Sequence, residues 1–121
     1  MTTEFVGLAQ LPVKYRVTEQ GIIGRCQLNA NWQGYQGLLH GGIAATLIDD
    51  AMVNCLLAHR IQAMTASLTL RYLHPVPVTQ PMEVVVQITE QKRRLHCLQA
   101  NLHVAGRVSV MANSKFMATA N

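Results

Sequence analysis

Hydrophobic residues recur with two different spacings along this chain. From residue 38 to residue 58 the sequence is apolar on nearly every side, and no Pro or Gly follows Gly42 in this stretch. Ala and Leu are strong helix formers, and a helix that is apolar on most faces is buried. The pattern therefore predicts one central buried helix that begins at Gly41 or Gly42 and ends near His59.

Strand spacing dominates the rest of the chain. Alternating apolar and polar residues, or runs of β-branched residues, predict strands over residues 22–30, 63–73, 82–89, 95–105 and 108–120. Short turns at residues 91–94 and 106–107 join the last three strands, so these strands are expected to form an antiparallel meander. Residues 1–20 are mixed in character and are interpreted as an arm or a short helix.

The order of these elements predicts an α+β fold, in which a strongly curved antiparallel sheet wraps around the one long buried helix. A small sheet covers only one face of a helix. The remaining cover is therefore expected from the curvature of the sheet and from a partner subunit. We expect an N-terminal arm over residues 1–20 and a single domain over residues 21–121.

The composition limits the kinds of partner. The chain has 121 residues, which suits one domain, and 13% of them are charged, against about a quarter in typical proteins. This low fraction indicates a large buried surface or a subunit interface. The formal net charge of +4 fits a polyanionic ligand such as a nucleotide phosphate. No DNA- or RNA-binding motif is found, so we expect no nucleic acid partner.

The cysteines and the chain's hydropathy bear on its location. Cys26, Cys55 and Cys97 are odd in number and widely spaced, which predicts reduced thiols rather than disulfides. No metal-ligand spacing is found among the histidines, so we expect no metal site. No run of 18 apolar residues and no signal-peptide pattern is found. We therefore expect a cytoplasmic protein that is not embedded in a membrane.

The start of the predicted helix carries the candidate chemistry. Gly41 and Gly42 let the backbone approach a ligand closely, and the free N–H groups of a first helical turn suit an oxyanion or a phosphate. Asp49 and Asp50 follow within the apolar part of the helix, where an unpaired charge is costly. Adjacent helical residues point about 100° apart, so these two carboxylates are expected to have different roles.

These residues resemble a known family. His40-Gly41-Gly42, followed nine residues after the His by Asp49, is similar to the hotdog-fold acyl-CoA thioesterase superfamily. The closest likeness is to its phenylacetyl-CoA and medium-to-long-chain acyl-CoA thioesterase branch. The Gly-rich lead-in at residues 34–39 and the Tyr-x-x-Pro pattern that ends at Pro75 extend this likeness. It covers roughly residues 20–120 in element order.

The resemblance implies roles for individual residues. Asp49 matches the catalytic carboxylate, which acts as a general base or as a nucleophile. Gly41 matches the position whose N–H polarises the thioester carbonyl, and Gly42 lets the backbone pass close by. Thr65 matches a residue that helps to orient the attacking water. In this fold the carboxylate and the N–H donor come from different subunits, which implies a homodimer or a homotetramer. The resemblance implies an acyl-CoA substrate and no cofactor.

One position departs from the pattern. Several relatives have Asn or Gln six residues before the His, and here that position is Gly34. Gln36, two residues further on, is a candidate to contact the thioester instead. His40 is a candidate general acid or base, although the favoured interpretation is that it hydrogen-bonds to the backbone and orders the loop. Asp50 is expected to be an interface or capping residue.

The basic residues leave a choice open. Arg93 and Arg94 belong to the predicted turn at residues 91–94, which is basic. They could hold the phosphates of coenzyme A, or the turn could simply be exposed to solvent. Arg71 is a similar candidate.

Two other functions compete with hydrolysis. A hydratase of this fold has a His five residues after its catalytic Asp, where this chain has Asn54, so that function is less favoured. A non-catalytic acyl-CoA-binding protein is the main alternative, because of Gly34.

Overall fold

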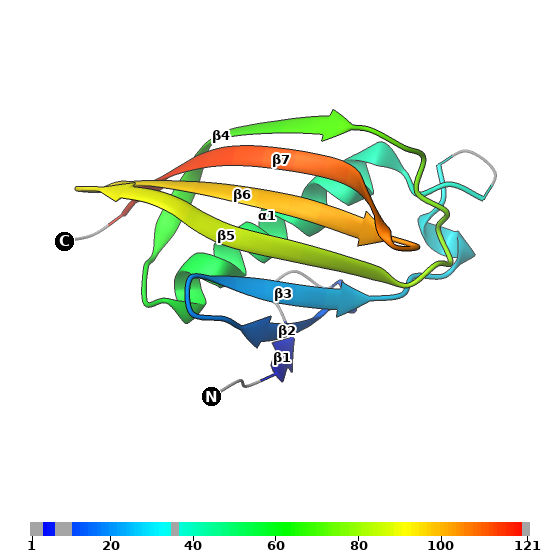
Figure 1. Cartoon of the computed structure of the whole chain (residues 1–121), viewed down its shortest axis with the longest axis horizontal. Helices are drawn as coiled ribbons and strands as arrows, with labels where there is room; N and C mark the ends of the chain where they lie inside the picture. The colour runs from blue at the N-terminus through cyan, green and yellow to red at the C-terminus, as the bar shows by residue number, and fades with distance from the viewer. Residues whose placement is uncertain (1–3, 7–10, 35–36, 120–121) are drawn as a thin grey trace.

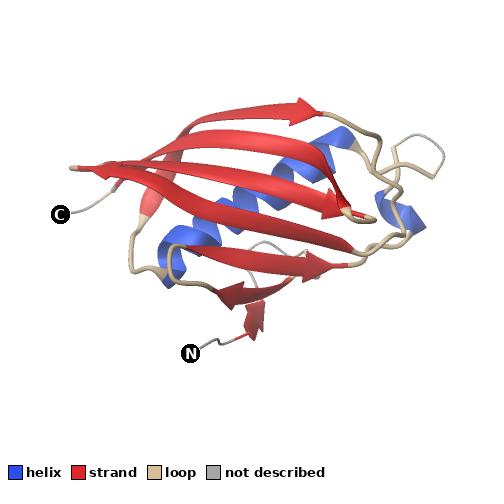
Figure 2. Ribbon diagram, in the orientation of Figure 1, coloured by secondary structure: helices blue, strands red, loops and turns tan. Residues whose placement is uncertain are grey.

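The computed structural model describes residues 4–6, 11–34 and 37–119. A long helix, α1 (Gly41–Ala58), lies against one face of a seven-stranded sheet (Figures 1 and 2). A short 3₁₀ helix, η1 (Ala30–Trp32), precedes α1. The strands are β1 (Glu4–Val6), β2 (Lys14–Val17), β3 (Gly21–Cys26), β4 (Ala63–Tyr72), β5 (Met82–Lys92), β6 (Leu95–Val104) and β7 (Arg107–Ala118).

The sheet has the strand order β1-β2-β3-β5-β6-β7-β4, and every neighbouring pair is antiparallel. The predicted meander of the last three strands is therefore confirmed. Strand β4 joins the far side of β7 and forms one edge of the sheet. Figure 1 shows the sheet curving around α1, which is the hotdog arrangement that the sequence predicted.

Helix α1 provides the centre of the core, as predicted. Half of its residues are buried, including Leu47, Ile48, Met52 and Leu56. Buried residues of β5, β6 and β7 share this core. By length and composition alone α1 resembles a membrane-spanning helix, but half of that stretch is buried inside this molecule, as in the core helix of a globular protein.

The first strands differ from the expected arm or short helix. Residues 4–6 and 14–17 form β1 and β2, which extend the sheet beyond β3. Leu11, Val13 and Tyr15 are buried, whereas Pro12 and Lys14 between them are exposed. This alternation is the strand signal that the sequence analysis overlooked. The alternation covers few residues, and β2 is stabilised by its pairing with β3.

Two boundaries also differ from the prediction. Strand β3 ends at Cys26 rather than near residue 30, and residues 27–29 lead directly into η1. Strand β5 continues to Lys92, so the predicted basic turn is reduced to Arg93 and Arg94. Arg93 has a positive φ of 58°, which closes a tight hairpin.

Candidate active site

The N-terminus of α1 is capped by the side chain of His40. Its Nδ1 atom accepts a hydrogen bond of 2.9 Å from the backbone N–H of Gly42. A Cβ atom at Gly42 would lie 3.1 Å from two atoms of the imidazole ring, so glycine makes room for this cap. While Nδ1 accepts, the neutral ring carries its proton on Nε2. This is the backbone contact that the sequence analysis favoured for His40, and a catalytic role for this residue stays a prediction.

Gly41 offers a free donor beside this cap. Among the described residues, no acceptor lies within hydrogen-bonding distance of its N–H. Its carbonyl oxygen, in contrast, accepts a hydrogen bond of 2.8 Å from the hydroxyl of Tyr72 at the end of β4. The first N–H groups of a helix attract anions, because they lack partners within the helix and lie at its positive end. The contact with Tyr72 was not predicted from the sequence.

The loop before α1 is held by the segment that follows Pro75. Leu39 N–H donates to Val76 O at 2.8 Å, and Val78 N–H donates to Gly37 O at 3.0 Å. The tyrosine of the Tyr-x-x-Pro pattern thus bonds to the first residue of α1. The extended segment after Pro75 bonds to the loop that leads into α1.

Gly34 lies close to His40, so a side chain at this position would be tightly packed against it. A Cβ atom at Gly34 would lie 3.1 Å from the Cα atom of His40 and 3.4 Å from its Cβ atom. The amide that several relatives carry at this position would require His40 to shift by a few tenths of an ångström. Gln36 lies outside the described residues, so the idea that its side chain contacts the thioester in place of that amide stays a prediction.

A mostly apolar cavity of about 650 Å³ opens beside the start of α1. Its size and lining are typical of a small-molecule site. It is lined by Gly34, Leu38, Leu39, His40, Gly41, Ala44, Tyr72, Leu73, His74, Pro75 and Val76.

Asp49 lies further along α1 and contacts Thr65. The hydroxyl of Thr65 donates to Oδ1 of Asp49 at 2.9 Å. Strand β4 has an irregularity between Thr65 and Ser67, so that Ala66 is an extra residue there. Such a bulge redirects neighbouring side chains. Asp49 is half-buried and Thr65 is exposed, so this pair lies at the surface of the chain.

Asp50 is neither an interface residue nor a cap, which corrects the sequence analysis. It is 7% exposed, and its Oδ2 atom accepts a hydrogen bond of 2.6 Å from the hydroxyl of the buried Tyr15. Asn54 donates from its side chain to the backbone oxygen of Asp50 at 2.8 Å. Burial, and then the hydrogen bond to Asp50, raise the pKa of Tyr15 above its ordinary value.

The two halves of the candidate site lie apart within one chain. Gly41 and Asp49 are eight residues apart on α1, which corresponds to about 12 Å at 1.5 Å per residue. A carboxylate at that distance cannot act on a carbonyl that is bound to the N–H of Gly41. One chain therefore contains both of these candidate residues but does not bring them together.

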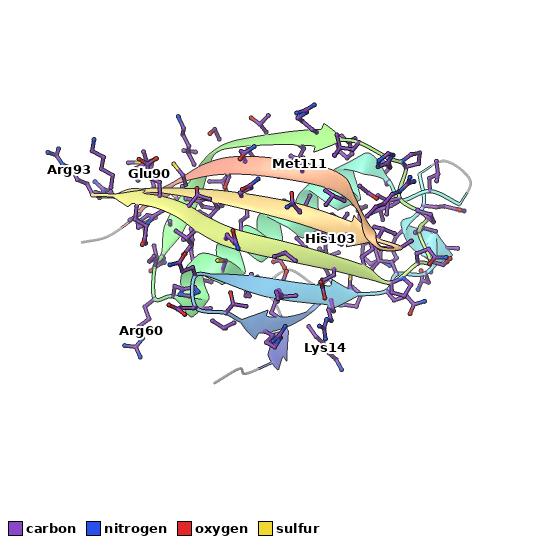
Figure 3. All side chains as sticks on the ribbon, in the orientation of Figure 1. Lys14, Arg60, Glu90, Arg93, His103 and Met111 are labelled. Carbon is purple, nitrogen blue, oxygen red and sulfur yellow. The ribbon has the colours of Figure 1, made fainter. Side chains whose placement is uncertain are left out.

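The candidate phosphate-binding arginines occupy other parts of the molecule. Figure 3 shows Arg93 at the tip of the β5–β6 hairpin, whereas α1 begins at the opposite end of the molecule in Figure 1. Arg94 donates through Nε and Nη2 to the carbonyl of Ala118, at 3.1 and 2.8 Å. Arg71 is exposed next to Tyr72, and alternation along the strand directs it to the opposite face.

The buried Cys55 and the partly buried Cys26 are poor nucleophiles. Burial raises the pKa of the Cys55 thiol to about 12 and that of Cys26 to about 11. Both thiols are therefore neutral near pH 7.

Known proteins resemble this chain in sequence and in structure. The thioesterase superfamily matches residues 36–111. Acyl-coenzyme A thioesterase THEM4 from Mus musculus is 31% identical over 80 residues, which are 66% of this chain and 34% of the mouse protein. The chain thus spans about a third of that relative's length.

Solved structures resemble the whole chain. A thioesterase superfamily protein has a TM-score of 0.83 and 26% identity, over 88% of this chain and 53% of its own. A hypothetical thioesterase protein from Streptococcus pneumoniae TIGR4, solved with coenzyme A, has a TM-score of 0.84 and 14% identity, over 100% of this chain and 98% of its own. The sequence match extends over more than half of the chain, and the fold agrees with it. The chain therefore belongs to the thioesterase superfamily.

Proposed function

We propose that the protein hydrolyses the thioester of an acyl-CoA to a free acid and a thiol. The observation that carries this proposal is the Asp49–Thr65 hydrogen bond together with the N–H of Gly41, which has no acceptor in the part of the chain that the structure describes. The mouse relative is an acyl-CoA thioesterase, and the Streptococcus pneumoniae structure contains coenzyme A. The apolar cavity beside Gly41 gives an acyl-CoA a place to bind.

The chemistry needs a carboxylate, a water molecule and an N–H donor. Thr65 occupies Oδ1 of Asp49, so Oδ2 is left to take a proton from water as the water attacks the thioester carbon. The oxyanion that forms is stabilised by the N–H of Gly41. When the tetrahedral intermediate collapses, the C–S bond breaks and the thiolate takes a proton. Asp49 is the donor, because it carries the proton that it took from the water, and the Nε2–H of His40 is a candidate to hydrogen-bond to the departing sulfur.

Asp49 has a second possible route, as a nucleophile. Its carboxylate would attack the thioester carbon and expel the thiolate, and water would then hydrolyse the resulting anhydride. Both routes need the same oxyanion donor.

The active unit is proposed to be a dimer, since Gly41 and Asp49 of one chain are too far apart to share a substrate. Strand β4 supports this proposal, because one edge of it pairs with no other strand in the described part of the chain. Met64 on this strand is 67% exposed. An edge strand ten residues long is an available pairing site. Two β4 strands paired antiparallel would bring the Gly41 end of one subunit towards Asp49 of the partner subunit. Two such dimers would form the homotetramer.

Antiparallel pairing also bears on the arginines. It would bring the β5–β6 hairpin of one subunit towards the start of α1 in the other. In this arrangement Arg93 and Arg71 remain candidates for the phosphates of coenzyme A. Arg94 would contribute less, because its guanidinium already binds Ala118.

The decisive test is thiol release from a panel of acyl-CoAs by the wild type and by Asp49→Asn. We expect the variant to lose at least about a hundredfold in kcat, because an amide can neither take a proton from water nor attack the carbonyl. Thr65→Ser is the matched control, since it keeps the hydroxyl that contacts Asp49. Equal rates for the wild type and Asp49→Asn would refute the role of Asp49.

A non-catalytic acyl-CoA-binding protein is the second candidate function. Gly34 favours it, because the amide that contacts the thioester in several relatives is missing here, and a side chain would be tightly packed against His40. A folded, dimeric wild type that binds acyl-CoA tightly and releases no thiol would establish it. The hydratase alternative has lost support, because Asn54 is buried and donates to the backbone of Asp50.

A further inference from the structure

Two adjacent carboxylates tie α1 to opposite sides of the sheet. Asp50 accepts from Tyr15 on β2, and Asp49 accepts from Thr65 on β4. Strand β2 lies next to one edge of the sheet, and β4 forms the other edge. The proposed reaction uses Asp49 and Thr65 but gives no role to Tyr15 and Asp50.

The contact between Tyr15 and Asp50 depends on a specific arrangement of the strands. Tyr15 pairs across the strands with Gly24 of β3. A Cβ atom at Gly24 would lie 2.7 Å from Cε1 and 2.9 Å from Cδ1 of the tyrosine ring. The glycine therefore lets the ring lie against β3 and reach α1. Tyr15 is fully buried, and its 2.6 Å bond to the carboxylate has the length of a charge-assisted hydrogen bond.

A buried carboxylate is an inefficient way to stabilise a core. Taking a charge out of water is costly, and an apolar residue of similar volume often stabilises as well or better. A hydrogen bond has a direction that apolar packing lacks. Because neighbouring helical residues are fixed about 100° apart, a bond that sets the direction of Asp50 also sets the direction of Asp49.

We propose that Tyr15 is a positioning residue for Asp49: its hydrogen bond to Asp50 sets the rotation of α1 that presents Asp49 to Thr65 and to the thioester. This inference rests on the proposed hydrolysis for its effect on rate. Burial, and then the hydrogen bond to Asp50, raise the pKa of Tyr15, so its hydroxyl keeps its proton and remains a donor near neutral pH.

The test is Tyr15→Phe, which removes one oxygen atom and keeps the ring. We expect kcat to fall about tenfold or more while KM stays unchanged, because a small displacement of a reacting group slows the chemical step. In the Asp49→Asn background, the same change should leave the residual rate unchanged, because no carboxylate is left to position. Equal losses in both backgrounds, or no loss in either, would overturn the proposal.

The matched control is His59→Leu, which removes another hydrogen bond between α1's end and the sheet. His59 Nε2 lies 3.0 Å from the carbonyl oxygen of Gly21, just beyond the last residue of α1. We expect this variant to lose stability and to keep its kcat, when both are measured well below its unfolding temperature. A loss of kcat as large as that of Tyr15→Phe would mean that any weakened helix contact has the same effect.

A second readout does not need turnover. The carboxyl ¹³C resonance of Asp49 can be assigned by its absence in Asp49→Asn. We expect Tyr15→Phe to shift this resonance and His59→Leu to leave it in place. An unmoved resonance in Tyr15→Phe would overturn the positioning role. If the wild type releases no thiol, the proposed function fails, and the resonance still decides whether Tyr15 positions Asp49.

Discussion

The two polar groups of the Gly41 backbone differ in their contacts. Its carbonyl is held by Tyr72, while its N–H has no acceptor among the described residues. The absence of a side chain matters little for space, because a Cβ atom there would come no closer than 3.8 Å to Tyr72. The chemical value of this residue should therefore lie in its N–H alone.

Proline at this position would remove that N–H and little else. Proline suits the first position of a helix, and His40 before it has the extended backbone that proline favours. We expect Gly41→Pro to fold and to lose about a hundredfold or more in kcat, whereas Gly41→Ala keeps most of its activity. Steady-state thiol release, with circular dichroism to verify folding, measures both. Similar activity in the two variants would exclude Gly41 as the oxyanion donor.

At the scale of the element, the start of α1 depends on His40 as its cap. We expect His40→Ala to lower the free energy of unfolding by about 1 kcal/mol, because Gly42 N–H loses its acceptor. His40→Asn should restore this stability, since Asn is among the best capping residues. Urea denaturation measures the effect.

Turnover by the same two variants separates the roles proposed for His40. If His40→Asn recovers stability and kcat together, His40 acts as a cap only. If it recovers stability and kcat stays low, the imidazole takes part in proton transfer.

The elements that could be predicted are those with long and regular patterns. Helix α1 begins at Gly41 and ends at Ala58, as expected, since its apolar run is long and a glycine pair marks its start. Strand β2 was missed because the alternation at residues 11–15 is short and includes Pro12, which lies just before the strand. Its stability comes from pairing with β3, and such a partner cannot be identified from local sequence.

The candidate site shows the same limit. Asp49 and Thr65 were matched through the resemblance to a family, and their contact lies beside the bulge in β4, which the sequence pattern does not predict. The role of Asp50 was wrongly interpreted because its partner, Tyr15, is 35 residues away in the chain. A contact over that separation depends on the strand order, which periodicity alone does not reveal.

At the scale of the molecule, the separation of Gly41 from Asp49 makes subunit exchange informative. We expect Gly41→Pro and Asp49→Asn to be inactive alone and to regain about a quarter of wild-type activity when co-expressed in equal amounts. Half of the dimers are then mixed, and each mixed dimer has one complete site. Differently tagged subunits allow the mixed dimer to be isolated and assayed. An inactive mixed dimer would show that the two residues do not act across an interface.

The adjacent carboxylates on α1 also constrain how this chain can change in length during evolution. Deleting one residue between Gly41 and Asp49 would turn all following side chains by about 100°. The side chain of Asp50 would then point towards Thr65. Ala51 would take the buried place of Asp50, and it cannot accept a hydrogen bond from Tyr15. Insertions and deletions should therefore be tolerated at the Ala105–Gly106 hairpin and be absent from the first half of α1. Length variants of the family provide a record of this constraint.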